Sequence, residues 1–374
     1  MIYVIFFLML LGVASNGLLK KYALVNIEYK RELSKKAAEV DEELELTTVV
    51  ENSKILPVTF IQVHEKFPCE MKYISDVNIT EVNNYIHHTS TMVIMPYQRI
   101  KRTYNVSFSY RGRYILRDAE LISGDMLGLS VTSKAIEYWQ EIVVYPKALD
   151  LEEMLEPYGD YMGNISVVRW IVEDPILTIG VNEYSGREPQ KHINWPVSLR
   201  AGKLMVNKFD HTIDNNIMII LNIACLKPLW LGIEEEKLET VLSITRALME
   251  QFEKQGIPYG FISNIQGFSY RDGKDLIEPS IGNAHFFSIL DGLGRAEYSP
   301  NMNFKSLLET VIYGEKSIGT FVIVTPEVPD ECIQHINSLG KSSDKTTLIC
   351  LGTNNIDGLN RDIRIFSERG EKNE

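Results

Sequence analysis

The chain has 374 residues, of which 45% are hydrophobic and 24% are charged, and its formal net charge is −12. This composition is typical of a globular protein with two domains of ordinary size, and it argues against a disordered chain. An acidic surface repels phosphate backbones, so we expect no nucleic-acid partner. The four cysteines form no C-x-x-C pair, and His87 and His88 have no further ligand at metal-binding spacing, so we predict no metal and no cofactor.

The first element is an uncharged apolar run from Ile2 to Leu19. A helix needs about 17 to 20 apolar residues to cross a bilayer, so the run predicts a transmembrane anchor at residues 2–19. Lys20 and Lys21 follow it, and positive charge on that flank predicts a single-pass cell-membrane protein with cytoplasmic domains. A secretory signal is the alternative, although it requires a basic residue before the run and none precedes Ile2.

Residues 37–147 contain short runs in which apolar and polar side chains alternate. Turn residues separate these runs, and no long helical period occurs before Leu151. Several short strands with turns between them predict a β-sandwich domain. The runs are Val58–Val63, Thr91–Met95, Tyr104–Tyr110, Tyr114–Leu121 and Ile142–Tyr145.

Residues 148–206 are predicted to be a linker that ends in a segment of unusual composition, residues 180–206. That segment mixes charged and aromatic side chains with Gly and Pro, which break both the helical and the strand period. One interpretation is a surface loop whose aromatic residues fill its base.

Residues 207–352 show strands that alternate with helices. The continuous apolar run that begins at Ile217 is typical of a strand in a sheet covered on both faces. A helix is expected from Glu234 to Gln255, with Gly256 as its stop. Further strands are expected at 258–263, 320–324 and 346–351, and helices at 304–313 and 328–339. This alternation predicts βαβ units, followed by a polar, loosely attached tail at 353–374.

The segment at 180–206 resembles the signature of the domain of unknown function 58 family. The matching residues are Glu183, Tyr184, Gly186, Trp195, Ser198 and Arg200. Two positions where the family pattern has Asp are Arg187 and Asn194 here. The resemblance implies that the matching residues matter, that a MoxR-type AAA+ ATPase is the partner, and that the protein takes part in assembling or maturing other proteins.

The domain after residue 207 resembles the von Willebrand factor A-like fold, a Rossmann-like α/β fold. Members of that fold often bind a metal through the pattern Asp-x-Ser-x-Ser, one carboxylate and two hydroxyls suited to magnesium. The corresponding residues here are Asn222, Ala224 and Leu226, so all three oxygen ligands are lost. Glu327, behind Thr325, is the acidic residue expected after a later strand. We predict a degenerate site without metal.

The expected fold class is therefore α+β and multidomain: an N-terminal transmembrane helix, a β-sandwich and a von Willebrand factor A-like α/β domain. The expected function is that of a membrane-anchored, non-enzymatic adapter that works with the ATPase. Two alternatives remain open. One is an extracellular adhesion or ligand-binding module, and the other is a hydrolase-type enzyme with Glu183 and His192 as acid and base.

For the signature segment we predict a structural clasp between the domains. A guanidinium suits a carboxylate in a bidentate pair, so Arg200 is expected to be at least partly buried against Glu183. Trp195 is expected to pack beneath the pair as an apolar floor. The alternative is that the segment is itself the contact surface for a partner.

Overall fold

A computed structural model describes most of the chain, in two compact units that divide near Lys147. The described residues are 21–75, 77–124, 131–158, 167, 171, 178–184, 193–209, 216–224, 234–266, 276–314, 319–343, 345–352 and 356–368.

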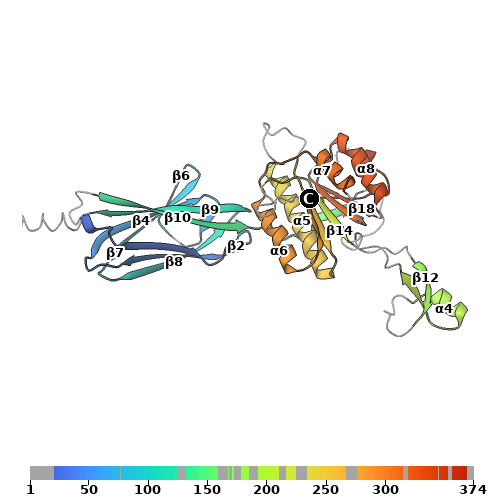
Figure 1. The fold of residues 1–374 in the computed structure, drawn as a ribbon, viewed down its shortest axis with the longest axis horizontal. Helices are drawn as coiled ribbons and strands as arrows, with labels where there is room; N and C mark the ends of the chain where they lie inside the picture. Colours follow the sequence, from blue (N-terminus) through green and yellow to red (C-terminus); the bar gives the residue numbers. More distant parts are fainter. Residues whose placement is uncertain are drawn as a thin grey trace, which may run out of the picture. The chain divides into compact units, whose positions relative to one another are not determined.

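The first unit is a two-layer β-sandwich, coloured blue to teal in Figure 1. One sheet has four strands in the order β1-β3-β8-β5, and the other has six in the order β2-β10-β9-β4-β7-β6. Neighbouring strands are antiparallel except β2 and β10, which are parallel. The strands are β1 (Ile27–Leu33), β2 (Ala37–Ala38), β3 (Leu44–Asn52), β4 (Val58–Pro68), β5 (Met71–Tyr73), β6 (Ile79–Val82), β7 (Tyr85–Ile94), β8 (Arg99–Phe108), β9 (Gly112–Gly124) and β10 (Val131–Val144).

Alternating burial creates the sandwich core. Every second residue of β1 is buried, and β3 has the same period, as expected for strands with one face inward. The inward side chains form two apolar clusters, one around Phe67 and Phe108 and the other around Ile61 and Leu121. The hairpin between β6 and β7 turns through Asn83 and Asn84, both with positive φ, a conformation that Asn tolerates and that two-residue hairpins require.

The second unit contains a seven-stranded sheet in the order β11-β19-β18-β17-β14-β15-β16. The five inner strands are parallel, and the two edge strands, β11 and β16, are antiparallel to their neighbours. The strands are β11 (Leu155–Pro157), β14 (Ile217–Leu221), β15 (Tyr259–Ser263), β16 (Leu276–Ser280), β17 (Thr320–Thr325), β18 (Lys345–Cys350) and β19 (Arg364–Glu368).

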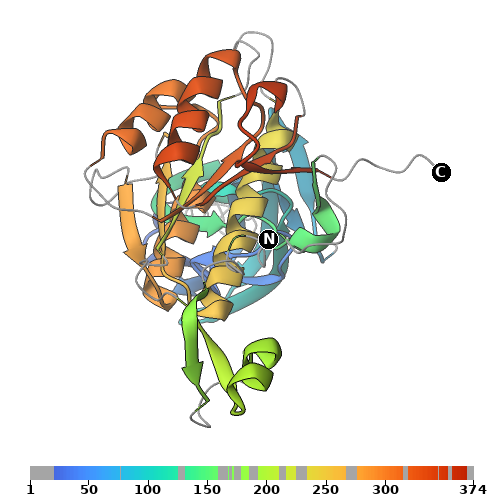
Figure 2. The same cartoon turned by 90° about the vertical axis from the view of Figure 1, so that its right-hand side faces the viewer.

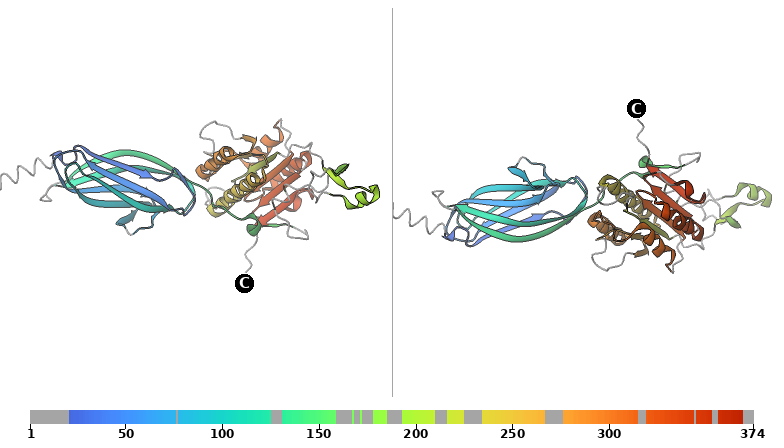
Figure 3. Two further views of the ribbon diagram at one scale, coloured as in Figure 1. Left: turned by 90° about the horizontal axis from the view of Figure 1, so that it is seen from below. Right: turned by 90° about the horizontal axis from the view of Figure 1, so that it is seen from above.

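Helices cover both faces of this sheet. All five residues of β14 are buried, which requires cover on both sides. Met218 and Ile220 pack into the cluster formed with α7 and α8, whereas α5 contacts β14 and β17 from the opposite face. Figures 2 and 3 show α5 and the α7–α8 pair on opposite sides of the sheet. The helices are α2 (Leu151–Met154), α5 (Glu235–Gln255), α6 (Asn283–Arg295), α7 (Phe304–Ile312) and α8 (Ile333–Ser342).

The signature segment forms a small element of its own. β12 (Thr178–Glu183) and β13 (Met205–Phe209) pair as an antiparallel two-stranded sheet, and α4 (Trp195–Ala201) lies between them in the chain. Figure 1 labels β12 and α4.

The predicted fold class is wrong as stated. Among the described residues, strands account for 45% and helices for 26%, so this part of the chain is mostly β. The sandwich strands are longer than the apolar runs that predicted them, and β10 alone has 14 residues. Backbone pairing needs no apolar side chain, so the strands continue through polar residues that the pattern excluded.

The predicted membrane anchor is also corrected. Residues 2–19 lie outside the described part of the chain, and none of the described helices is long and apolar enough to cross a membrane. The 21-residue α5 is amphipathic, with Glu235, Glu239 and Lys254 among its charges, and it buries one face on the sheet. The single-pass localisation in the cell membrane is therefore not retained.

Two segments belong to sheets beyond the ranges predicted for the domains. β1 begins at Ile27, before residue 37, and β19 falls in the predicted polar tail. The tail has few apolar residues, but parallel pairing with β18 buries Phe366, and the neighbouring Ile363 joins the core.

Candidate functional site

The signature segment is built around the start of α4. Asn194 is the N-cap, and its side-chain oxygen accepts a hydrogen bond of 3.1 Å from the backbone N–H of Val197. Pro196 lies in the first turn, and Gly202 ends the helix in the left-handed conformation, with φ of 68°. Asn and Asp cap helices about equally well, so Asn194 performs a role that needs an oxygen acceptor rather than a negative charge.

Ser198 fixes one side of α4 to β13. Its side chain is buried, and its hydroxyl accepts a hydrogen bond of 2.8 Å from the N–H of Met205 and donates one of 2.7 Å to the carbonyl of Asn194. The N–H of Asn194 donates to the carbonyl of Met205 at 2.8 Å. Tyr184, half-buried at the end of β12, donates its N–H to the carbonyl of Leu204 at 2.8 Å. The helix is thereby held to β13, which is itself paired with β12.

Two residues of α4 present large apolar side chains to solvent. Trp195 is 61% exposed and Leu199 is 83% exposed. Residues four apart are neighbours on a helix surface, so the two side chains lie on the same side. We call Trp195, Leu199 and the exposed Arg200 the α4 face. Two exposed large apolar residues on one seven-residue helix form a local concentration of the kind that marks contact surfaces.

The predicted clasp is wrong. Arg200 is exposed, and Trp195 is no buried floor. The carboxylate of Glu183 pairs with Lys203 instead, at 2.6 Å, and both side chains are more than half exposed. The cap at Asn194 explains the error. It makes Trp195 the first helical residue and places Arg200 in the last turn, where a cation complements the helix dipole.

Two predicted positions in this segment cannot be placed. Gly186 and His192 lie outside the described residues. The structure therefore gives no geometry for an acid–base pair of Glu183 and His192. Leu199, which the sequence analysis did not single out, has the most exposed large apolar side chain of α4. Its position four residues after Trp195 was the signal that could have found it.

A second polar group lies at the carboxyl ends of β14, β15 and β17. The side-chain amide of Asn222 donates to Thr325 Oγ1 at 2.9 Å and to the carbonyl of Ala224 at 3.1 Å. Its oxygen accepts from the N–H of Ala224 at 2.9 Å and from Asn264 Nδ2 at 2.8 Å. Asn264 also bonds the N–H of Ile223 and the carbonyl of Met302. We call Asn222, Asn264 and Thr325 the amide network.

The polar side-chain atoms of the amide network form hydrogen bonds to other groups of the protein. Both amide hydrogens and the oxygen of Asn222 are engaged, and Thr325 donates its hydroxyl to the carbonyl of Glu327 at 2.7 Å. Lys237 binds Glu327 at 2.8 Å, and hydrogen bonds to Glu234 and then Glu327 raise the pKa of Lys237. The carboxylate of Glu327 is therefore paired with the ammonium group of Lys237. Leu226, the third predicted position, lies outside the described residues.

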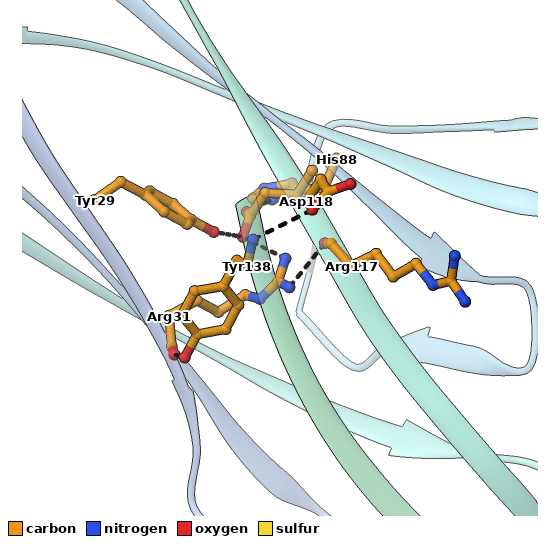
Figure 4. A network of polar contacts seen from close by, with 7 residues as sticks. Tyr29, Arg31, His88, Arg117, Asp118 and Tyr138 are labelled. Carbon is orange, nitrogen blue, oxygen red and sulfur yellow. Dashed lines mark hydrogen bonds and ion pairs between the residues drawn. The ribbon is translucent and has the colours of Figure 1, made fainter. Parts of the chain in front are cut away.

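A third polar group, missed by the sequence analysis, is buried inside the sandwich and drawn in Figure 4. Glu65 of β4 lies opposite His88 of β7, whose Nδ1 is 2.9 Å from the carboxylate. Arg31 of β1, in the other sheet, places Nη1 3.5 Å from the same carboxylate and donates from Nη2 to the carbonyl of Arg117 at 3.0 Å. We call Arg31, Glu65 and His88 the ionic cluster.

Aromatic side chains surround the ionic cluster. Tyr29 donates its hydroxyl to Glu65, and the rings of Phe67 and Tyr138 lie 5.0 and 5.1 Å from the guanidinium of Arg31. The register of β9 and β10 shifts between Ile136 and Trp139, an irregularity that can re-aim a side chain, and Tyr138 lies within it. Burial, and then the charge of Glu65, raise the pKa of Tyr29.

The ionic cluster links the two sheets and offers no reactive group to solvent. Arg31, Glu65 and His88 are each at most 2% exposed. Within the described residues, no group of three or more His, Cys, Asp or Glu side chains is placed to hold a metal ion. The sequence did contain a signal, because all three residues occupy inward positions of strands whose burial alternates.

Comparison with known proteins assigns no family. No protein-family model matches the chain, and no curated protein matches it. Many solved structures are similar to parts of it, and three of them serve as examples. The CARDB domain of the PF1109 protein from Pyrococcus furiosus is 15% identical, with 32% of this chain and 90% of that chain covered and a TM-score of 0.21.

The other two solved structures also match only a part of this chain. A cohesin module of a family 33 glycoside hydrolase from Clostridium perfringens is 12% identical, with 30% of this chain and 95% of that chain covered and a TM-score of 0.21. The chitin-binding domain of Chi18aC from Streptomyces coelicolor is 12% identical, with 22% and 81% covered and a TM-score of 0.18. Similarity at this level transfers no function. The von Willebrand factor A-like domain was part of the predicted fold class that the strand and helix content of the described residues contradicts, so it is not retained.

Proposed function

We propose that this chain is a non-enzymatic protein-interaction protein that binds a partner protein through the α4 face. The carrying observation is the exposure of Trp195 and Leu199 on a helix that Ser198 fixes to β13. A helix held in this way presents its exposed side chains in a defined arrangement before a partner arrives. Preorganisation of that kind lowers the ordering cost of binding.

The other polar groups support this class of function over catalysis. Glu183 is an exposed carboxylate that forms a surface ion pair with Lys203. The amide network uses its donors and acceptors internally, and the ionic cluster is buried. No observation on the described residues favours the hydrolase or the adhesion module.

The side chain of Trp195 is large enough to contribute a substantial part of the binding free energy of an interface. Aromatic side chains bury about 150–250 Å² each in cores and interfaces. Removing a central Trp from an interface weakens binding by about 2 kcal/mol or more, which corresponds to roughly 30-fold in the dissociation constant. We therefore expect Trp195 to contribute more than Arg200, whose charge is exposed to solvent.

Binding to the purified MoxR-type ATPase, the partner that the family resemblance implies, tests the proposal. The full chain is immobilised, and the dissociation constant is compared for the native chain, Trp195→Ala and Leu199→Ser. Tyr313→Ala is the matched control, because Tyr313 is an aromatic residue that is 82% exposed on another helix end. We expect Trp195→Ala to weaken binding about 30-fold and the control to leave it unchanged. Equal binding by all variants would exclude the α4 face, and absence of binding by the native chain would exclude this partner.

A further inference from the structure

One end of the β-sandwich exposes large apolar side chains that come from four separate places in the sequence. The last residues of β3 pair with the first residues of β1 and of β8, and Val58 at the start of β4 pairs with Ile94 at the end of β7. β9 ends and β10 begins at the same end. The side chains there that are between 45% and 73% exposed form what we call the apolar end: Val25, Ile55, Val93, Met95, Tyr97 and Val131.

A buried asparagine satisfies polar backbone groups in two of the turns at this end. Asn52 is fully buried, and its side-chain amide donates to the carbonyls of Leu56 and Met95, each at 2.9 Å. Its side-chain oxygen accepts from the N–H of Lys54 at 3.3 Å, and the N–H of Tyr97 donates to the carbonyl of Lys54 at 3.3 Å. The β3–β4 loop and the β7–β8 turn therefore supply hydrogen-bond partners to each other, and these backbone groups do not depend on water.

Lys54 satisfies the turn before β1 in the same way. Its ammonium donates to the carbonyls of Ala23 at 2.6 Å and Val25 at 2.7 Å, whereas the ammonium of a surface Lys usually stays in water. Burial lowers the pKa of Lys54 to about 8, because a desolvated ammonium is less stable than a hydrated one. The N–H of Met95 donates to Oε1 of Gln98 at 2.7 Å. Side chains thus form hydrogen bonds that water forms in most surface turns.

These internal hydrogen bonds distinguish between a lipid and a protein as the occupant of the apolar end. A backbone polar group that enters lipid needs a partner within the protein, because the medium supplies none. A protein interface instead carries about one hydrogen bond per 100–200 Å², and groups that are already bonded within the turns cannot supply it. At the edge of the apolar end, Glu51 and Arg99 pair with each other at 4.0 Å. Exposed apolar side chains on turns of this kind therefore favour a lipid surface.

We propose that the apolar end of the sandwich inserts into the surface of a lipid bilayer with zwitterionic headgroups. The side chains of Val25, Ile55 and Met95 enter the acyl boundary, and the ring of Tyr97 lies among the headgroups, where amphipathic aromatic rings are favoured. Zwitterionic headgroups fit because a chain of net charge −12 is repelled by an anionic surface. The contact uses turns and requires no membrane-spanning helix. It goes beyond the proposed function and does not involve the α4 face.

Cosedimentation of the full chain with phosphatidylcholine vesicles tests the proposal. The native chain is compared with the double variant Ile55→Ser with Tyr97→Ser. The matched control is Ile74→Ser with Tyr110→Ser, which removes the same two residue types where they are 50% and 65% exposed, after β5 and after β8 and away from the apolar end. We expect the first double variant to lower the partition coefficient at least about tenfold and the control to leave it unchanged, because binding scales with the apolar area that is buried.

Two further measurements identify insertion as the mode of binding. Tyr97→Trp places an indole at the apolar end, and its fluorescence, after subtraction of the native signal, is expected to be quenched by brominated phosphatidylcholine. Tyr110→Trp is the control and is expected to show no quenching. Binding of the native chain is expected to be unchanged between 50 and 500 mM salt, because salt screens charges and does not weaken apolar burial.

The outcomes separate this inference from the proposed function. No vesicle binding by the native chain, equal binding by the two double variants, or binding that falls with salt overturns the lipid contact. ATPase binding that is lost in Ile55→Ser with Tyr97→Ser, without vesicle binding by the native chain, means that a protein covers the apolar end and also overturns it. Trp195→Ala is expected to bind vesicles like the native chain, so loss of ATPase binding in that variant concerns the α4 face alone.

Discussion

The ionic cluster and the amide network are both buried groups of polar side chains, but the first is charged and the second is neutral. The ionic cluster in the sandwich contains a guanidinium, a carboxylate and an imidazole, whereas the amide network at the strand ends of the other unit is neutral. All six side chains are at most 2% exposed. The amide network engages both hydrogens of Asn222, but Nε and Nη1 of Arg31 make no hydrogen bond.

The two groups differ in the free energy that is lost when one partner is removed. Desolvating a charge costs several kcal/mol, and its partner offsets that cost only while both are present. A neutral amide loses about 1–3 kcal/mol when one buried partner is removed. The ionic cluster is therefore expected to be the more fragile of the two, although both connect strands that are distant in sequence.

The largest expected effect comes from removing the cation. Arg31→Met leaves the carboxylate of Glu65 buried without its guanidinium, and we expect a loss of roughly 3–5 kcal/mol in the free energy of unfolding. Urea denaturation measures this loss. The double variant Arg31→Met with Glu65→Gln removes the uncompensated charge and is expected to recover part of it. A loss no larger than that of a neutral amide, about 1–3 kcal/mol, for the single variant would show that the cluster behaves like the neutral network.

A smaller effect is expected from the amide network. Asn264→Ala leaves the N–H of Ile223 and the oxygen of Asn222 each without one partner. We expect a loss of about 1–3 kcal/mol in the free energy of unfolding, measured by the same denaturation. Gln334→Ala, at an exposed position of α8, is the control and is expected to change little. A loss as large as that of Arg31→Met would contradict the ranking of the two groups.

Alkaline pH is expected to separate the two groups further. Burial and the charge of Glu65 raise the pKa of Tyr29 above its ordinary value of about 10. Above pH 10 the unfolded chain loses the proton of Tyr29, whereas the folded chain keeps it. The contribution of Tyr29 to the free energy of unfolding is therefore constant below pH 10 and falls as the pH rises above it. The slope is at most about 1.4 kcal/mol per pH unit for one tyrosine.

Urea unfolding between pH 9 and 11 tests this expectation. Tyr29→Phe should reduce the slope, while Tyr313→Phe, at an exposed position, should leave it unchanged. Asn222, Asn264 and Thr325 do not titrate, so the amide network contributes nothing to the slope. An unchanged slope in Tyr29→Phe would mean that this hydroxyl ionises in the folded state as it does in the unfolded one.

The smallest effect on stability is expected at the α4 face, which is exposed where both polar groups are buried. Arg200→Ala and Trp195→Ala should each change the free energy of unfolding by no more than about 0.5 kcal/mol, as exposed positions usually do. Thermal unfolding of the full chain measures the change. A loss of several kcal/mol for Arg200→Ala would restore the buried clasp that this structure contradicts.

Local sequence patterns predicted helices and strands, and the alternation within a strand indicates which of its side chains face inward. Period-two alternation predicted strands between residues 37 and 147, and the spacing of apolar residues with Gly256 as stop predicted a helix that matches α5 to within one residue. Arg31, Glu65 and His88 lie at inward positions of strands whose burial alternates, but none of them falls in a run that the sequence analysis predicted, and no local pattern shows that they meet. Asn194 before Trp195 and Pro196 also contained the signal for the N-cap of α4.

Tertiary structure alone decided which distant residues became partners and which side chains stayed in solvent. Arg31 and Glu65 lie in different sheets, and Asn222 meets Thr325 across 103 positions of sequence. Such contacts depend on strand order and register, which no local spacing specifies. The exposure of Trp195 was decided in the same way. An indole among charged residues suits a buried floor or a contact surface equally, and only the packing of α4 in the folded chain left Trp195 in solvent.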